Sequence, residues 1–229
     1  MPRGGVRPRD TRTAGSDFLF EIAIDLLYFE RSAHQSGACR VAGLDEVGRG
    51  PLAGPVVASA VVFPEGLLIP GVTDSKQMTE DRRNRMYTEI TAAAVAYGIG
   101  IVDERTIDEV NIREASITAM EHALDAISPA PDHLLIDGNF ILPRVSIPQK
   151  AIIKGDCRSH SIAAASILAK VTRDRIMRDL HERYPRYNFQ KHKGYCTAEH
   201  LALLKQHGPC EAHRKSFQPV AGMLQERLR

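Results

Sequence analysis

The chain has 229 residues, of which 43% are hydrophobic and 25% charged, and it contains no Trp. This is the composition of an ordinary folded domain, and it excludes collagenous and intrinsically disordered proteins. The longest apolar stretch, residues 18–29, is interrupted by Glu21 and Asp25 and is shorter than the ~20 residues that a membrane span needs. The same two carboxylates are incompatible with the apolar part of a secretory signal. We therefore expect a cytoplasmic monomer without a membrane segment.

The first 38 residues are predicted to precede the main domain. Residues 1–16 are rich in Arg, Gly, Pro and Thr without an apolar period, which indicates a mobile tail. Residues 18–29 carry apolar side chains at helical spacing and predict a leader helix that ends within residues 32–37. We expect this helix to pack on a domain formed by residues 39–229.

The segment after the leader changes to the β-branched pattern of strands. Strands at 41–47 and 55–63 are joined by a Gly/Pro loop too short for a helical crossover, so we expect them to pair antiparallel. A helix over 79–94, capped by Thr79, leads to a third strand at 95–102.

The remainder of the chain alternates helices and strands. The predicted elements are a helix at 106–127, strands at 133–137 and 151–154, and helices at 161–184, 197–207 and 220–228. Strands flanked by helices in this order predict an α/β fold, with a mixed sheet covered on both faces.

Charge is distributed unevenly along the chain. Residues 1–149 hold 14 Lys and Arg against 21 Asp and Glu, whereas residues 150–229 hold 16 against 7. The basic residues between 170 and 193 are interleaved with aromatic ones, a pattern that fits contacts to a nucleic-acid backbone and its sugars or bases. They are Lys170, Arg173, Arg175, Arg178, Arg183, Arg186, Lys191 and Lys193, with Tyr184, Tyr187, Phe189 and Tyr195 nearby. A plain solvated basic surface is the alternative.

Four carboxylates stand at the ends of predicted strands. Asp45 and Glu46 interrupt an apolar strand, Asp137 ends an apolar run, and Asp156 follows the strand at 151–154. Charged side chains avoid burial unless they are paired or bind a metal. An all-oxygen set suits Mg²⁺ or Mn²⁺ rather than Zn²⁺, and two such ions can hydrolyse a phosphodiester.

Each of these positions also has an ordinary structural explanation. Asp45 and Glu46 can form an acidic turn, and Asp137 begins an Asp-Gly-Asn turn sequence. Asp156 can cap the following helix, although Ser159 or Ser161 can equally take that role.

The glycines after the first strand resemble a dinucleotide-binding loop only superficially. Such a loop must open a helix, whereas Gly50 is followed by Pro51 and a β-branched run. The bare amides of Gly48 and Gly50, with Arg49 between them, can instead meet one phosphate of a polymer backbone.

A competing metal site would use sulfur and imidazole. Cys196, His200, Cys210 and His213 have the ligand types of a tetrahedral zinc centre. Their spacing matches no zinc module that we can justify physically, and surface His and buried Cys are common alternatives.

Seven segments in this order resemble the bacterial ribonuclease HII family, the type 2 ribonucleases H. They are VAGLDEVGRGPLAGPVVASAVV (41–62), DSK (74–76), LLIDGN (134–139), IIKGD (152–156), SIAAASILAKVTRDR (161–175), YPRYNFQKHKGYCTAEH (184–200) and HRKSF (213–217). The resemblance runs from about residue 39 to residue 220. It implies a ribonuclease H-like fold, with a mixed five-stranded sheet, helices on both faces and a C-terminal helical region.

The resemblance also implies roles for individual residues. The metal-binding acids of the family match Asp45, Glu46, Asp137 and Asp156, which agrees with the set found above. The implied substrate-binding residues are the GRG motif at the RNA–DNA junction, the Tyr that stacks on the junction ribose, and four less certain contacts. In this sequence they are Gly48, Arg49, Gly50, Tyr195, Ser75, Lys76, Lys154 and Ser159.

The implied activity is Mg²⁺- or Mn²⁺-assisted hydrolysis on the 5′ side of a ribonucleotide, leaving a 3′-hydroxyl and a 5′-phosphate. The substrates would be RNA–DNA hybrids and duplex DNA containing ribonucleotides. Two alternatives remain: a nucleic-acid-binding module of the same fold without catalysis, against which the intact carboxylate set counts, and another two-metal nuclease such as a junction resolvase, against which the GRG motif and Tyr195 count.

Overall fold

The computed structural model describes residues 25–73 and 75–226, which contain one five-stranded sheet in the order β3-β2-β1-β4-β5. The strands are β1 (Val41–Val47), β2 (Val56–Val62), β3 (Ala96–Val102), β4 (His133–Asp137) and β5 (Gln149–Ile152). β1, β2 and β3 form an antiparallel meander, and β4 and β5 run parallel to β1. The predicted mixed sheet and the antiparallel pairing of its first two strands are confirmed.

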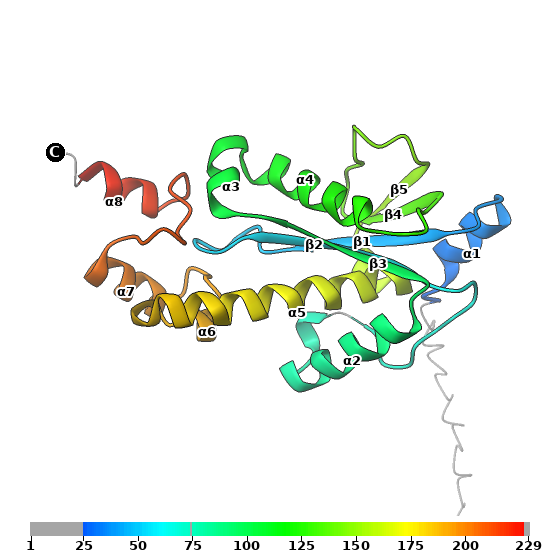
Figure 1. Ribbon diagram of the computed structural model, residues 1–229, viewed down its shortest axis with the longest axis horizontal. Helices are drawn as coiled ribbons and strands as arrows, with labels where there is room; N and C mark the ends of the chain where they lie inside the picture. Colours follow the sequence, from blue (N-terminus) through cyan, green and yellow to red (C-terminus); the bar gives the residue numbers. More distant parts are fainter. Residues whose placement is uncertain (1–24, 74, 227–229) are drawn as a thin grey trace, which may run out of the picture.

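Helices cover both faces of this sheet, as predicted, and extend beyond one end of it (Figure 1). They are α1 (Tyr28–Gln35), α2 (Glu80–Ala93), α3 (Glu104–Val110), α4 (Ile112–Asp125), α5 (His160–Arg183), α6 (Phe189–His192), α7 (Ala198–His207) and α8 (Val220–Glu226). α4 packs on β1, β2 and β3 from one face, whereas α5 packs on β1 and β2 from the other, with α2 against it. α6, α7 and α8 form the C-terminal helical region at the far end of α5 (Figure 1).

Both faces of the sheet are covered by helices, so its central strands are buried on both sides and consist mostly of apolar residues. Leu44, Ala58 and Leu134 belong to the core under α4, and Val61 belongs to the core under α2 and α5. All seven residues of β2 are buried, and so are the first five of β1. A charged residue at the end of β1 is therefore held by one of the least mobile elements of the fold.

The structure differs from the sequence-based expectation in three element boundaries. The helix predicted at 106–127 is two helices, because Asn111 adopts a φ of 76° and its side chain caps α4 by accepting from the amides of Arg113 and Glu114. The last predicted strand lies at Gln149–Ile152 rather than 151–154, because Lys154 turns to a left-handed φ of 56°. The leader helix predicted at 18–29 is not helical over the described residues 25–27; α1 begins only at Tyr28, after a turn, and ends at Gln35, within the predicted stop at 32–37. The tail at 1–16 and the start of the predicted helix lie outside the described residues. The division of the chain at residue 38 stays a prediction.

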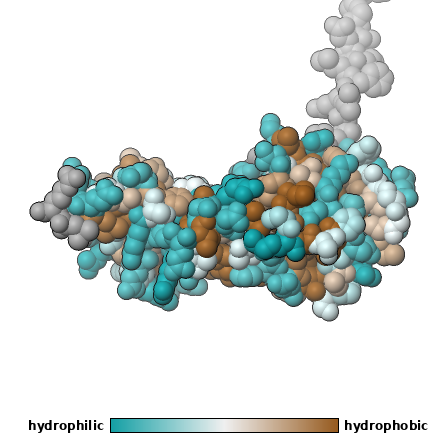
Figure 2. All heavy atoms as spheres, turned by 90° about the horizontal axis from the view of Figure 1, so that it is seen from above, coloured by the Kyte–Doolittle hydropathy of each residue, from teal (hydrophilic) through white to brown (hydrophobic). Residues whose placement is uncertain are grey.

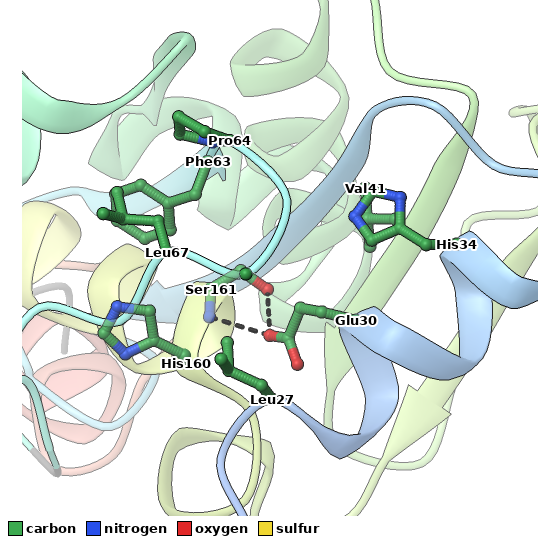
Figure 3. Close-up of a pocket in the computed structure, with 10 residues that line it drawn as sticks. Leu27, Glu30, His34, Val41, Phe63, Pro64, Leu67, His160 and Ser161 are labelled. Carbon is green, nitrogen blue, oxygen red and sulfur yellow. Dashed lines mark hydrogen bonds between the residues drawn. The ribbon is translucent and has the colours of Figure 1, made fainter.

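α1 is attached to the domain through the apolar side chains of Phe29 and Ala33 and through one buried carboxylate. Glu30 Oε1 accepts from Ser159 Oγ at 2.6 Å, from Ser161 N at 2.9 Å and from Ser161 Oγ at 2.7 Å. Figure 3 shows Glu30 pointing from α1 toward Ser161, across a small cavity that His160 also lines. A negative charge at this position stabilises the first turn of α5, where the helix leaves amides unpaired.

The surface is mostly hydrophilic over the C-terminal helical end, which is narrower than the end that holds the sheet (Figure 2). None of the helices formed by the described residues is long and apolar enough to cross a membrane.

Candidate active site

The predicted carboxylates Asp45, Glu46, Asp137 and Asp156 lie where β1, β4 and β5 reach their carboxyl ends, a place that we call the carboxylate edge. β1 and β4 are parallel neighbours whose register pairs Leu44 with Ile136. The next residue of each strand, Asp45 and Asp137, therefore also lies beside the other. Asp156 lies four residues after β5, in a short 3₁₀ turn at Gly155–Cys157. The structure thus brings together acids that are more than 100 residues apart in the sequence.

The acids at this edge repel one another. Burial, followed by the charges of Glu46 and Asp137, raises the pKa of Asp45 well above its usual value; the charge of Asp156 adds to the increase, and a hydrogen bond from Ser166 opposes it. Burial also raises the pKa of Glu46, against the opposing effect of Arg49. The pKa of Asp137 is raised by burial first, although the amide of Gly155 opposes the change. A cation bound here would offset both the cost of burying negative charge and the repulsion between the carboxylates.

Protein groups satisfy part of this negative charge. Lys76 Nζ lies 3.1 Å from Asp156 Oδ2, and Arg49 NH1 lies 3.1 Å from Glu46 Oε1. The amide of Gly155 donates to Asp137 Oδ1 at 2.6 Å. With these partners in place, no three His, Cys, Asp or Glu side chains in residues 25–73 and 75–226 converge on a point that would hold a metal ion.

The residues nevertheless fit a hard divalent cation. Glu46 Oε2 is buried without a hydrogen-bond partner, and a buried carboxylate oxygen left in that state is costly. The donors at the edge are all carboxylate oxygens, which Mg²⁺ and Mn²⁺ prefer. Asp45, Glu46, Asp137 and Asp156 are therefore the residues that would hold such an ion.

The glycine loop and Tyr195 lie next to one another, beside the end of β1. Arg49 and Gly50 are exposed, and Tyr195 is 41% exposed. The amide of Leu52 donates to the carbonyl of Gly194 at 2.8 Å, which ties the loop to the residue before Tyr195. An atom added as Cβ at Gly50 would meet nothing within 4 Å, so a bulky ligand can approach the chain closely at this point.

Four further residues were expected to contact substrate: the two lysines among them are exposed, whereas the two serines are buried. Lys76 and Lys154 are exposed, and the amino group of Lys76 reaches Asp156. Ser75 is buried, with Oγ 2.9 Å from Ser166 Oγ. Ser159 has no exposed surface, caps α5 and donates to Glu30. As it stands, Ser159 cannot reach a substrate, because its hydroxyl is already engaged inside the protein.

Ser166 is a site residue that the sequence did not reveal. It connects Ser75 to Asp45, since its hydroxyl contacts Ser75 Oγ and bonds to the Asp45 side chain. A hydroxyl within the apolar run SIAAASIL was the available signal, but Ser in a helix most often bonds to its own backbone.

The prediction that Arg173 belongs to the basic surface is wrong. Arg173 has no exposed surface, and its guanidinium donates to the carbonyls of Pro55, Ala53 and Lys193 at 2.9–3.1 Å. It therefore holds the loop after β1 rather than a phosphate. Lys191, which pairs with Glu199 at 2.8 Å, stays on the surface.

The zinc alternative is also wrong for the described residues. Cys196 is exposed, and the other three residues bond to one another and to the backbone. His213 Nδ1 accepts from the amide of Cys210 at 3.0 Å, so its proton is on Nε2, which donates to His200 Nε2 at 3.1 Å. His200 consequently donates from Nδ1 to the carbonyl of Tyr195 at 2.9 Å. This chain of neutral imidazoles consumes the nitrogens that a metal would need.

The neutral state of His213 predicts a loss of stability in acid. Burial, and secondly the neighbouring His200, lower the pKa of His213 from 6.5 to about 4. Below pH 6.5 the unfolded chain takes up a proton that the folded chain refuses until about pH 4, so the free energy of unfolding falls as the pH drops through this range. The shift corresponds to about 3 kcal/mol. By pH 5.0 about 2 kcal/mol of this is lost, and urea unfolding at pH 7.5 and 5.0 measures that part.

His213→Gln is the matched control, because an amide retains a donor toward His200 but does not titrate. The variant should show a shallower pH dependence than the wild type, with the remainder due to His200 and His192, whose pKa values burial also lowers. An equally steep dependence in the variant would mean that His213 is not the neutral group described here.

Comparison with known proteins identifies the family. The family model described as ribonuclease HII matches residues 42–220. The chain is 51% identical to ribonuclease HII of Bacillus thuringiensis (strain Al Hakam) over 203 residues, which cover 89% of this chain and 78% of the relative. Among solved structures, it resembles ribonuclease H2 from Pyrococcus horikoshii OT3, with a TM-score of 0.71 and 26% identity over 83% of this chain and 99% of that one. The fold also resembles that of Bst-RNase HIII in complex with Mn²⁺, with a TM-score of 0.60 and 20% identity over 85% and 72% of the two chains.

These matches confirm the resemblance found in the sequence and the ribonuclease H-like fold. The carboxylate edge, the glycine loop and β4 all lie inside the matched residues. The chain belongs to the ribonuclease HII family, whose members are divalent-metal-dependent endoribonucleases that cleave the RNA of RNA–DNA hybrids.

Proposed function

We propose that this enzyme also cuts duplex DNA on the 5′ side of a single embedded ribonucleotide and leaves a 3′-hydroxyl and a 5′-phosphate. The observation that carries the proposal is that the carboxylate edge lies beside Tyr195 and the loop at Gly48–Gly50, in which Arg49 and Gly50 are exposed. The carboxylates suit a metal-assisted reaction at a phosphodiester, and the neighbouring loop and Tyr195 suit recognition of the nucleotide beside the cut.

Asp45, Glu46, Asp137 and Asp156 hold Mg²⁺ or Mn²⁺ in this proposal. The bound cation supplies a water of lowered pKa and stabilises charge on the leaving oxygen. The sheet keeps Asp45 and Asp137 side by side, because these two acids follow paired residues of adjacent parallel strands. Lys76, whose amino group already lies at Asp156, is positioned to balance phosphate charge when substrate is present.

The loop and Tyr195 supply selectivity for ribonucleotides. A repair enzyme must accept any base sequence, so the 2′-hydroxyl is the group that distinguishes RNA from DNA at the cut. In this proposal the amides of the exposed residues Arg49 and Gly50 bond the sugar-phosphate backbone, and the half-exposed ring of Tyr195 packs on the sugar. A site built around a hydroxyl rejects the analogue that lacks it by ~10⁴–10⁵-fold.

Three labelled duplexes test the proposal: one with a single ribonucleotide, one of DNA only, and an RNA–DNA hybrid. With Mn²⁺ or Mg²⁺ present, we expect a single cut 5′ of the ribonucleotide, several cuts in the hybrid, and none in the all-DNA duplex. Extension by a DNA polymerase identifies the 3′-hydroxyl, and a 5′-phosphate-dependent exonuclease identifies the phosphate.

The control is the same set of reactions with a chelator in place of the metal. A cut on the 3′ side of the ribonucleotide, a cyclic phosphate product, or equal cutting of the all-DNA duplex would contradict the proposal. Cleavage of the hybrid alone would restrict the enzyme to the established activity of its family.

A further inference from the structure

Arg214 is an arginine without exposed surface whose guanidinium contacts the loop after β1. Its NH2 group donates to the carbonyls of Gly48 and Gly54 at 2.6 and 2.7 Å, NH1 donates to the carbonyl of Arg49 at 3.0 Å, and Nε donates to Gly54 at 3.0 Å. Burial, and secondly the charge of Arg173, lower the pKa of Arg214 to about 9. A cation buried in this way is costly, and the four hydrogen bonds to the loop compensate for it.

The hydrogen bonds of Arg214 determine which way the loop amides point. In a planar trans peptide the carbonyl and the N–H of the next residue point in opposite directions. Because the carbonyls of Gly48 and Arg49 point to the guanidinium, the amides of Arg49 and Gly50 point away from it. Neither amide donates to another group within the described residues. Two consecutive amides that point outward form an anion-binding nest.

Arg214 also fixes where this nest lies relative to Tyr195. Its own amide donates to the carbonyl of Leu52 at 2.8 Å, and the amide of Leu52 donates to the carbonyl of Gly194 at 2.8 Å. The buried guanidinium of Arg173 supports the same loop, and its Cζ lies 5.9 Å from the centre of the Tyr195 ring. The spacing between the outward amides and the ring is therefore set by groups buried beneath them.

We infer that Arg214 is a positioning residue for substrate recognition, which turns the amides of Arg49 and Gly50 outward to bind the phosphate at the ribonucleotide junction. The inference rests on the proposed function and names the residue that shapes its recognition site. Arg214 itself never touches the substrate, since it lies beneath the loop.

The variants Arg214→Met and Arg214→Lys test this role. Met preserves much of the volume but removes all donors, so the loop carbonyls lose their partners and the amides are no longer held outward. We expect single-turnover cleavage at a lone ribonucleotide to fall about 100-fold, the usual effect of misplacing a reacting group by about 1 Å. Lys retains the charge and a donor, and should recover part of this loss. The increase in melting temperature caused by Mn²⁺ should be unchanged in both variants, because the carboxylate edge is intact.

Ile117→Ala is the control for a general loss of stability. Ile117 is buried in the core under α4, so its truncation leaves a cavity there and removes no hydrogen bond to the loop. At 25 °C this variant should cleave the lone ribonucleotide at the wild-type rate. An equal loss of cleavage in Ile117→Ala and Arg214→Met would overturn the inference, because the effect would then be one of stability.

The outcomes separate this inference from the proposed function. If the wild type does not distinguish the lone ribonucleotide from all-DNA duplex, the proposed function fails. If the wild type distinguishes them and Tyr195→Ala slows cleavage, but Arg214→Met cuts at the wild-type rate, only the positioning role of Arg214 fails. Should Arg214→Met not fold, Arg214→Lys decides, since a wild-type rate and selectivity in that variant would equally overturn the inference.

Discussion

Asp45→Asn is expected to lower turnover by about 10³-fold or more while it stabilises the metal-free protein. Loss of one ligand charge removes several kcal/mol of transition-state stabilisation from a metal-assisted reaction. The same charge is unfavourable in the folded protein without metal, because burial and the neighbouring Glu46 and Asp137 raise the pKa of Asp45. The Asn amide keeps the shape and still accepts a hydrogen bond through its oxygen, as Asp45 Oδ1 does from the Glu46 amide at 2.7 Å.

Three measurements check this prediction: single-turnover cleavage of a hybrid, urea unfolding in the presence of a chelator, and the change in melting temperature on adding Mn²⁺. The variant should bind the hybrid, resist more urea than the wild type without metal, and lose most of the stabilisation by Mn²⁺. Turnover at the wild-type rate would exclude Asp45 as a metal ligand.

Asp132→Asn is the matched control, since the pKa of Asp132 is shifted the other way. Burial acts to raise the pKa of Asp132, but the amides of Arg40 and Cys39 and the charge of Arg40 together outweigh it, so the pKa is lowered. Asp132 Oδ1 accepts from the amides of Cys39 and Arg40 at 3.0 and 2.8 Å. Removing this charge should weaken the fold slightly and leave turnover unchanged. The two substitutions thus have opposite effects on stability, although the chemical change is identical.

Gly50→Ala is expected to slow cleavage at a lone ribonucleotide about 100-fold without a measurable loss of stability. An added Cβ meets no protein atom within 4 Å, and the φ of Gly50 is not positive, so the folded chain accommodates alanine. In the proposed complex the same space is needed by the phosphate that bonds to the Gly50 amide, and a methyl group there displaces the scissile bond.

Gly222→Ala in α8 is the control, because it makes the same chemical change in a helix far from the loop along the chain. Gly48→Ala gives the opposite contrast: its Cβ would lie 2.3 Å from Arg173 Nε at a φ of +96°, and that variant should lose stability. Unchanged cleavage by Gly50→Ala would show that substrate does not approach the loop at this residue.

The carboxylate site could be proposed from sequence because its signal is local. Charged residues inside apolar strands conflict with burial wherever their partners lie, and so Asp45, Glu46 and Asp137 are visible in single segments. The strands themselves were equally visible, because the β-branched runs between residues 41 and 102 leave little choice of structure.

The buried arginines could not be recognised in this way. Arg173 and Arg214 have the sequence signature of surface residues, and all but one of their acceptors lie 118 to 166 residues away in the chain. The role of Ser159 was hidden for the same reason, since Glu30 is 129 residues distant. The break at Asn111 was missed because the apolar period continues through it, and only the positive φ separates α3 from α4.

The order of strands in the sheet has a consequence for the chain while it is being synthesised. β1, β2 and β3 are consecutive in sequence and can pair as soon as residue 102 is available, but β1 is central and its other edge is covered only by β4. β4 begins about thirty residues after β3 ends, which is roughly 2–6 s of translation. During this interval the nascent meander presents an apolar edge with unpaired backbone groups, the kind of surface on which chains aggregate. The parallel pairing of β1 with β4, which brings Asp45 beside Asp137, therefore also covers the backbone groups that β1 leaves unpaired in the meander.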